Sequence, residues 1–184
     1  MSNYILYRKA DLSDIEALAE LRVEMLCENK DYSKDFKTDL YINTTQYMEN
    51  GFYDSSFISW VAMNTHSKII ATSGLTFYDL PPNDWCPNGK TAYLSSLYTL
   101  PEFRRKGIAK HLIALNIEEA KKNDCQRILL NTADISDTTD TADPTTASAV
   151  IESLYKKFGF ETSESAMAYF PFGKHHEKQE KQEK

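Results

Sequence analysis

The sequence is poor in cysteine and in long apolar segments. Its three cysteines, Cys27, Cys86 and Cys125, are odd in number and follow no metal-ligand spacing, which argues against a disulfide framework and a cysteine-bound metal. No apolar run approaches the ~20 residues that a membrane-spanning helix needs. Residues 1–11 also lack the pattern of a secretory signal peptide. We therefore expect a cytoplasmic protein with reduced thiols, no membrane segment and no metal.

An excess of positive charge is also missing. The chain has 21 Lys and Arg residues against 27 Asp and Glu residues, which gives a net charge of −6. A nucleic-acid-binding face requires clustered positive charge, so we expect no nucleic-acid partner. With 184 residues, 41% of them hydrophobic, the chain is long enough for one domain with a substantial core. We predict a single domain over residues 1–173 and a charged, disordered tail over residues 174–184.

One stretch of the chain, residues 93–120, combines a strand, a basic segment and an amphipathic helix. Residues 93–100 are rich in β-forming side chains, and Pro101 ends them. Apolar residues then recur near helical spacing, and the first turn of this predicted helix carries the basic segment 104–107 with its single glycine. The amides of a first helical turn lack partners and lie at the positive end of the helix dipole. The stretch therefore predicts a binding site for a phosphate or pyrophosphate group.

Two motifs resemble those of a known family. Arg104-x-x-Gly107-x-Ala109 resembles the acetyl-coenzyme A (acetyl-CoA) signature of the GNAT superfamily of N-acetyltransferases, in which Arg or Gln is followed at these spacings by Gly and by Gly or Ala. The segment Leu-Tyr-Lys-Lys-Phe-Gly-Phe at 154–160 is similar to the late motif of the same superfamily. The resemblance spans about residues 93–160. It implies an α/β (α+β) fold with a central mixed, mostly antiparallel sheet flanked by helices, and acetyl-CoA as the co-substrate.

The resemblance also implies where acetyl-CoA binds. The strand around Leu97 would diverge from a strand predicted at 127–132, and its backbone would pair with the pantetheine arm. The amides after Arg104 would hold the pyrophosphate, and the side chains of Arg104 and Arg105 would add contacts to the phosphates. Ser148 stands where relatives often carry a cofactor-binding Asn, and its hydroxyl has a shorter reach. The cofactor-binding residues predicted in this way are Leu97, Tyr98, Thr99, Arg104, Arg105, Lys106, Gly107, Ile108, Ala109, Lys110 and Ser148.

Tyr155, in the late motif, is the predicted catalytic residue. A phenol has an unperturbed pKa of about 10 and is protonated at neutral pH, so it can donate a proton to the departing CoA thiolate. The alternative is that Tyr155 only packs on the apolar side of its helix. The general base stays open, because segment 92–100 contains no Asp or Glu. Its candidates are Asp79, Asp84, Asp134 and a chain of water molecules.

The other elements follow from local patterns. Ser13 with Glu16 predicts a capping box at the start of the first helix, and Asn50-Gly51 predicts the end of the second. The Thr- and Asp-rich segment 133–146 predicts an acidic flap, since it lacks the spacing and the glycine of a calcium-binding loop. The remaining predicted elements are strands over 4–8, 57–63, 68–78 and 167–172 and a helix over 147–158.

The second predicted helix carries aromatic side chains at helical spacing, namely Phe36, Tyr41 and Tyr47. Core packing is the favoured interpretation of this stripe. In the alternative, the stripe forms a wall of the acceptor site, because the first two helices of the GNAT superfamily often border that site. Trp85, on the Pro-rich loop 79–90, has the same two interpretations.

The predicted function is the direct transfer of an acetyl group from acetyl-CoA to a primary amine. The acceptor is expected to be a small molecule or a peptide, and the net charge of −6 is compatible with a cation. Aminoglycosides, polyamines, amino acids and protein amines are all candidates. A homodimer is compatible with this function. Transfer of another acyl group is one alternative, and a non-catalytic acetyl-CoA sensor or regulatory subunit is the other.

Overall fold

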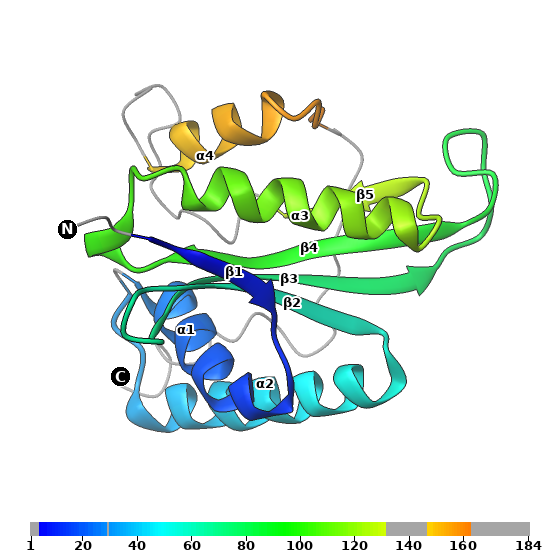
Figure 1. The fold of residues 1–184 in the computed structure, drawn as a ribbon. Helices are drawn as coiled ribbons and strands as arrows, with labels where there is room; N and C mark the ends of the chain where they lie inside the picture. Colours follow the sequence, from blue (N-terminus) through cyan, green and yellow to red (C-terminus); the bar gives the residue numbers. More distant parts are fainter. Residues whose placement is uncertain (1–3, 29, 132–146, 163–184) are drawn as a thin grey trace, which may run out of the picture.

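A five-stranded sheet forms the centre of the molecule (Figure 1). The computed structural model describes residues 4–28, 30–131 and 147–162, with side chains from residue 152 onward in the last segment. The strand order is β1-β2-β3-β4-β5; the first three neighbouring pairs are antiparallel and β4–β5 is parallel. The predicted mixed, mostly antiparallel sheet is therefore confirmed. The strands are β1 (Leu6–Lys9), β2 (Phe57–Met63), β3 (Ile69–Asp79), β4 (Lys90–Thr99) and β5 (Arg127–Leu129).

Helices cover both faces of this sheet. Helices α3 and α4 lie over one face, and α1 and α2 lie over the other (Figure 1). The helices are α1 (Ile15–Cys27), α2 (Lys34–Asp54), α3 (Ile108–Lys122) and α4 (Ala147–Lys156). The predicted strand over 167–172, flap over 133–146 and tail over 174–184 lie outside the described residues.

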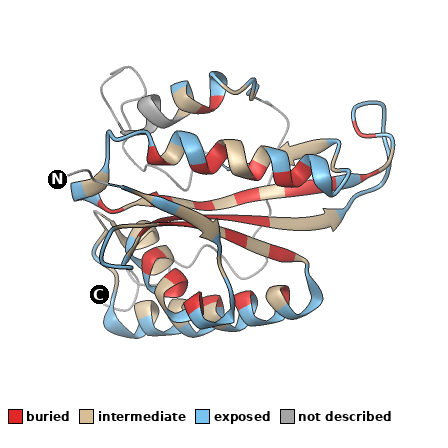
Figure 2. Cartoon of the chain, in the orientation of Figure 1, coloured by how far each residue is buried: buried red, intermediate tan, exposed pale blue. Residues whose placement is uncertain are grey.

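Buried residues lie on the sheet and on the helices that cover it (Figure 2), and the hydrophobic ones among them form the core. This is the arrangement that amphipathic helices require, since each buries one apolar stripe against a neighbouring layer. The cluster beneath α3 and α4 contains Leu75, Ala92, Leu94, Ile113, Ala120 and Tyr155. The cluster beneath α1 and α2 contains Ile15, Leu18, Met48, Phe57 and Val61.

The second helix does not end at Asn50-Gly51, contrary to the sequence prediction. Helix α2 continues to Asp54, and Ser55 terminates it in the left-handed region with φ of 64°. Gly51 is buried, and a Cβ atom at this position would overlap with the Cβ of Phe57. The glycine therefore lets α2 approach β2 closely, which is a packing requirement that a local helix-stop signal does not reveal.

The predicted capping box at Ser13 and Glu16 was also wrong. A single 3₁₀ turn, Leu12–Asp14, precedes α1, and its N-cap is Asp11. The Asp11 carboxylate accepts a hydrogen bond from the Ser13 amide at 2.9 Å, and the Asp14 carboxylate accepts one from the Asp11 amide at 2.9 Å. The box lies two residues earlier because Asp11 and Asp14 satisfy the same spacing rule with carboxylates.

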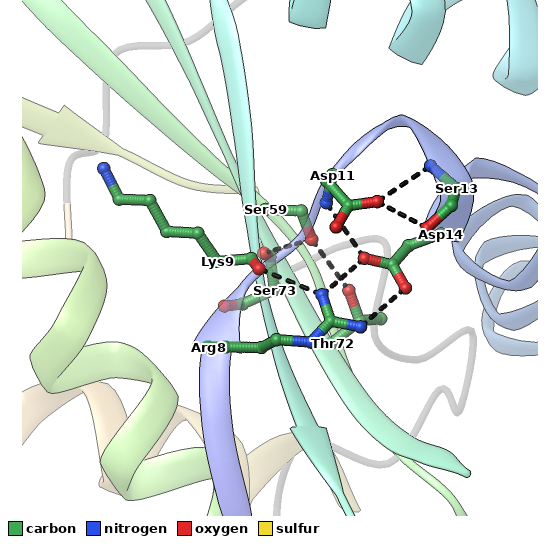
Figure 3. A network of polar contacts seen from close by, with 8 residues as sticks. All are labelled: Arg8, Lys9, Asp11, Ser13, Asp14, Ser59, Thr72 and Ser73. Atoms are coloured by element: carbon green, nitrogen blue, oxygen red, sulfur yellow. Dashed lines mark hydrogen bonds and ion pairs between the residues drawn. The ribbon is translucent and has the colours of Figure 1, made fainter. Parts of the chain in front are cut away.

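Asp14 also ties the start of α1 to β1 through Arg8 (Figure 3). The guanidinium donates from Nη1 to Asp14 Oδ2 at 2.6 Å and from Nη2 to Oδ1 at 2.8 Å. The Asp14 side chain is only 8% exposed, so this fork is largely shielded from water. The hydrogen bonds from Arg8 lower the pKa of Asp14 below its ordinary value.

We expect Asp14→Asn to lower the free energy of unfolding by about 2 kcal/mol at neutral pH, because it leaves the Arg8 charge without its carboxylate. A carboxylate whose folded pKa is depressed stabilises the fold above its ordinary pKa of about 4, and this contribution is lost as the pH falls through the lower folded value. The difference between the two proteins should therefore shrink toward pH ~3. Urea unfolding across this range measures it.

Asp39→Asn, an exposed carboxylate change on α2, is the matched control for this prediction. It should change stability by less than about 0.5 kcal/mol at every pH. A difference between wild type and Asp14→Asn that is independent of pH would contradict the electrostatic explanation.

Candidate active site

Strands β4 and β5 run side by side for three residues and then part. Their register pairs Thr91 with Arg127 and ends with Tyr93 opposite Leu129, whereas β4 continues to Thr99. Beyond Tyr93, this edge of β4 has no strand partner among the residues that the structure describes. Unpaired backbone N–H and C=O groups at such an edge can receive an extended ligand as an added strand. The divergence of the two strands that the sequence predicted is present.

A β-bulge bends β4 within the same region. Thr72 pairs with Tyr98 and Gly74 pairs with Ser95, so two residues of β4, Ser96 and Leu97, lie opposite one residue of β3. Ser96 has a positive φ of 53° and is buried. Bulges redirect a strand and increase its twist, and they occur frequently next to active sites. No sequence signal indicates this bulge, because the residue with the left-handed backbone is Ser96 and not a glycine.

The chain turns sharply between β4 and α3. A 3₁₀ turn over Pro101–Phe103 is followed by Arg105 with φ of 64° and Gly107 with φ of 78°. The prediction that the segment 104–107 forms the first turn of the helix was wrong, because α3 begins only at Ile108. Because Arg105 and Gly107 both adopt left-handed backbone angles, the chain leaves the helical path before Ile108.

The amino end of α3 has the properties of an anion site. Gly107 is the N-cap, and no side chain caps the helix there. A Cβ atom at Gly107 would meet no atom of the described residues within 4 Å, so these residues leave the space above this backbone open. The first amides of α3 are therefore available to a ligand at the positive end of the helix dipole.

The basic side chains of the turn differ in their contacts. Arg104 donates from Nε to the Thr99 carbonyl at 2.9 Å and from Nη2 to both Glu28 oxygens at 2.7 and 2.8 Å. Lys106 donates to the Glu102 carbonyl at 3.1 Å. Arg105 has no hydrogen bond or ion pair with the residues that the structure describes. Of the two arginines predicted to contact phosphate, Arg105 is thus unengaged and Arg104 is held by a carboxylate.

Tyr155, the predicted catalytic residue, lies on α4 and is 5% exposed. It packs in one cluster with Leu94 of β4, next to the point at which β4 and β5 part, and edge-on against Phe160 at a ring distance of 5.4 Å. Burial, with a smaller effect of Tyr93, raises the pKa of its phenol above the ordinary value. The phenol is therefore protonated at neutral pH. Ser148 lies on the same helix, and its side chain is outside the described set.

Asp79 and Asp84, the two described candidates for the general base, do not lie at the 104–107 turn. Asp79 pairs in register with Lys90, the first residue of β4, and thus lies at the opposite end of that strand from the 104–107 turn. Asp84 is exposed on the loop between β3 and β4. Asp134 lies outside the described residues.

A cavity of about 440 Å³ lies between α1, α2 and the end of β4. Its walls include Glu24 of α1, Tyr41 of α2 and Tyr98 of β4. Within the aromatic stripe of α2, Tyr41 thus reaches a cavity, whereas Tyr47 packs edge-on against Phe57 at 5.5 Å. Trp85 is 82% exposed on its loop.

Two residues near the turn were not singled out from the sequence. Glu24 accepts a hydrogen bond from the buried Tyr98 hydroxyl at 3.0 Å, and Glu28 binds Arg104. Glu20, Glu24 and Glu28 recur every four residues, which places them along one side of α1. That spacing was the available signal, but it does not say which basic groups the carboxylates meet.

Comparison with known proteins decides the family. The model of the Acetyltransferase (GNAT) family matches residues 24–160, which is more than half of the chain. The chain belongs to the GNAT family. It is therefore an N-acetyltransferase of the GNAT type with acetyl-CoA as its co-substrate, and the resemblance seen in the two motifs is confirmed. A comparison with curated protein sequences gives no match.

Solved structures share the fold of this acetyltransferase. A predicted acetyltransferase with acetyl-CoA from Clostridium acetobutylicum is 28% identical with a TM-score of 0.74, over 94% of this chain and 100% of that one. An aminoglycoside N-acetyltransferase in complex with CoA is 16% identical with a TM-score of 0.66, over 94% and 98%. Glucosamine-6-phosphate N-acetyltransferase from Arabidopsis thaliana is 15% identical with a TM-score of 0.59, over 91% and 99%. The last two likenesses show the fold alone.

Two further findings concern the described part of the acetyltransferase. None of its helices is both long and apolar enough to cross a membrane. Its described residues contain no group of three or more His, Cys, Asp or Glu side chains that could hold a metal ion.

Proposed function

We propose that this acetyltransferase transfers the acetyl group directly from acetyl-CoA to a primary amine, with the pyrophosphate on the amino end of α3 and the pantetheine arm along the free edge of β4. The observation that carries the proposal is the uncapped start of α3 at Gly107, after the turn that follows β4, together with an edge of β4 that has no strand partner beyond Tyr93 among the described residues. Together they offer amides to an anion and backbone groups to an extended amide-containing arm.

The chemistry follows from these positions. The amine nitrogen attacks the thioester carbonyl carbon, the new C–N bond forms, and the carbon–sulfur bond breaks. The amine loses a proton to water, because no Asp or Glu lies on β4. The departing thiolate takes a proton from the Tyr155 phenol, whose raised pKa keeps it protonated until this step. Holding donor and acceptor together supplies the remaining acceleration.

The proposal leaves the acceptor at the level of a primary amine on a small molecule or a peptide. The expected test is CoA release, measured with a thiol reagent, when the purified chain and acetyl-CoA are combined with each member of an amine panel. The panel should contain aminoglycosides, linear polyamines, free amino acids, and peptides with a free N-terminus or a lysine. Mass spectrometry of the acceptor then identifies the acetylated nitrogen.

The regulatory alternative predicts a different outcome of the same test. Tight acetyl-CoA binding by calorimetry, with no acetylated product from any amine, would favour a non-catalytic sensor. Replacing acetyl-CoA with longer acyl-CoA esters tests the second alternative, since a higher kcat/KM for one of them would identify another acyl group. We also propose a cytoplasmic location, because the three cysteines are scattered and free.

A further inference from the structure

Arg104 of the acetyl-CoA signature is held on three sides. Its Nη2 donates to both carboxylate oxygens of Glu28 at 2.7 and 2.8 Å, and its Nε donates to the Thr99 carbonyl at 2.9 Å. Its guanidinium also stands over the ring of Tyr98, 5.5 Å from the centroid. The planar fork of arginine forms such a set of directed bonds only in one orientation. The side chain therefore connects the carboxyl end of α1 with the last residues of β4.

These contacts fix the base of the turn that leads to α3. The Phe103 amide donates to the Leu100 carbonyl at 2.8 Å and the Arg104 amide to the Pro101 carbonyl at 3.2 Å, while the Arg104 side chain reaches back to Thr99. Directly afterwards, Arg105 adopts a left-handed φ of 64°. A non-glycine residue in this region costs about 1 kcal/mol and persists only where its surroundings hold it. The held Arg104 is the residue that precedes this strained position.

A second carboxylate supports the same arrangement from one helical turn away. Glu24 of α1 accepts a hydrogen bond from the Tyr98 hydroxyl at 3.0 Å, and Tyr98 is only 5% exposed. Burial and this hydrogen bond raise the pKa of the Tyr98 phenol, so it remains a donor. Glu24 and Glu28 thus hold the two stacked partners, the phenol ring and the guanidinium.

The charge of Arg104 is matched by Glu28 within this structure. The Arg104 guanidinium directs its Nη2 to Glu28 and its Nε to Thr99, whereas the amides at the start of α3 have no side-chain cap and Arg105 has no partner among the described residues. We propose that Glu28 is a positioning residue for the co-substrate: it holds Arg104 as a strut that sets the 104–107 turn, and the Arg104 side chain does not bind phosphate. This inference rests on the proposed binding of pyrophosphate at that turn.

The direction in which Glu28→Gln changes the affinity for acetyl-CoA distinguishes a positioning role of Arg104 from direct phosphate binding by its side chain. If Arg104 bound phosphate, Glu28 would offset the positive charge that attracts the phosphate, and removing this negative charge would tighten acetyl-CoA binding. If Arg104 is a strut, Glu28→Gln removes the carboxylate that anchors it. We then expect the Kd for acetyl-CoA to rise about 3- to 10-fold, a modest change because both side chains are partly exposed. Calorimetry without an acceptor measures it, and kcat at saturating acetyl-CoA should change less than about twofold.

Matched variants and a truncated ligand complete the test. Glu16→Gln removes the same charge from an exposed position at the start of α1 and should leave the Kd unchanged. The double variant with Arg104→Gln and Glu28→Gln should bind acetyl-CoA no more weakly than Arg104→Gln alone, because both substitutions break the same contact. S-acetyl-pantetheine, which has no phosphate, should show equal kcat/KM with wild type and Glu28→Gln. A general structural defect would lower kcat/KM for both donors and shift the thermal midpoint.

The outcomes distinguish this inference from the proposed function. Wild-type binding of acetyl-CoA with an equal or lower Kd in Glu28→Gln overturns the strut and leaves the proposed function intact. Additive effects of the Arg104 and Glu28 substitutions also overturn it. Absence of acetyl-CoA binding by the wild type overturns both.

Discussion

Replacing Tyr155 with phenylalanine is expected to lower kcat about 100-fold while the Kd for acetyl-CoA changes less than twofold. Loss of one positioned proton donor typically costs this much, since the thiolate must then leave without a proton or take one from water. The ring itself is retained, so its packing against Phe160 and the cluster with Leu94 is preserved. Steady-state kinetics with saturating acetyl-CoA, together with calorimetric binding, measures the two quantities.

The pH profile sharpens the assignment of Tyr155. Because burial raises its pKa above the ordinary phenol value of about 10, the donor stays protonated through the neutral and mildly alkaline range. Between neutral pH and about pH 9, the kcat of the wild type should therefore fall no more steeply than the kcat of the phenylalanine variant. Tyr78→Phe is the control, because burial also raises the pKa of this tyrosine, which pairs with Thr91 near the start of β4. Equal kcat for wild type and Tyr155→Phe would remove the catalytic role and leave Tyr155 as a packing residue.

Gly107→Ala is expected to raise the Kd for acetyl-CoA at least tenfold. With φ of 78°, alanine at this position costs about 1–2 kcal/mol of backbone strain, which the chain relieves by turning the amides of the segment away. Its methyl group would also project into the open space above the first amides of α3, where we place the pyrophosphate. Calorimetric titration with acetyl-CoA measures the effect directly.

Gly159→Ala provides a matched control for this substitution. Gly159 has φ of 86°, and an added Cβ would likewise meet no atom within 4 Å among the residues that the structure describes. The two variants should therefore lose similar stability, by about 1–2 kcal/mol, but only Gly107→Ala should lose affinity for acetyl-CoA. Equal loss of affinity in both would show that backbone strain alone, and not its position at α3, weakens binding.

Local patterns predicted much of the secondary structure. The strand predicted over 57–63 has the same bounds as β2, and the strand predicted over 68–78 corresponds to β3 with its bounds one residue earlier. Alternating β-branched and aromatic residues specify such strands without help from distant contacts. Errors occurred where a local signal had a tertiary use, as at Gly51, which serves close packing on Phe57 instead of ending the helix.

The residues of the candidate site likewise divide into those that the sequence predicted and those that it did not. Gly107 and Tyr155 were predicted because each belongs to a motif with a fixed spacing. The binding role of Gly107 and the catalytic role of Tyr155 stay predictions, which the variants described above test. The partners of Arg104 were not predicted, because Glu28 is separated from it by 76 residues. A sequence shows that both charges exist, but only folding decides which charges meet.

The sequence by itself supplied the glycine at the start of α3 and two motifs that resemble the GNAT superfamily, and this resemblance implied the mixed sheet, since each motif lies within a few consecutive residues. Tertiary structure alone decided that β4 bulges at Ser96, that it parts from β5 after Tyr93, and that Glu28 holds Arg104. The reason is physical. Propensity and spacing act over a few residues, whereas the packing of α1 against the sheet brings distant charges within hydrogen-bonding distance and so sets which side chains remain free for the ligand.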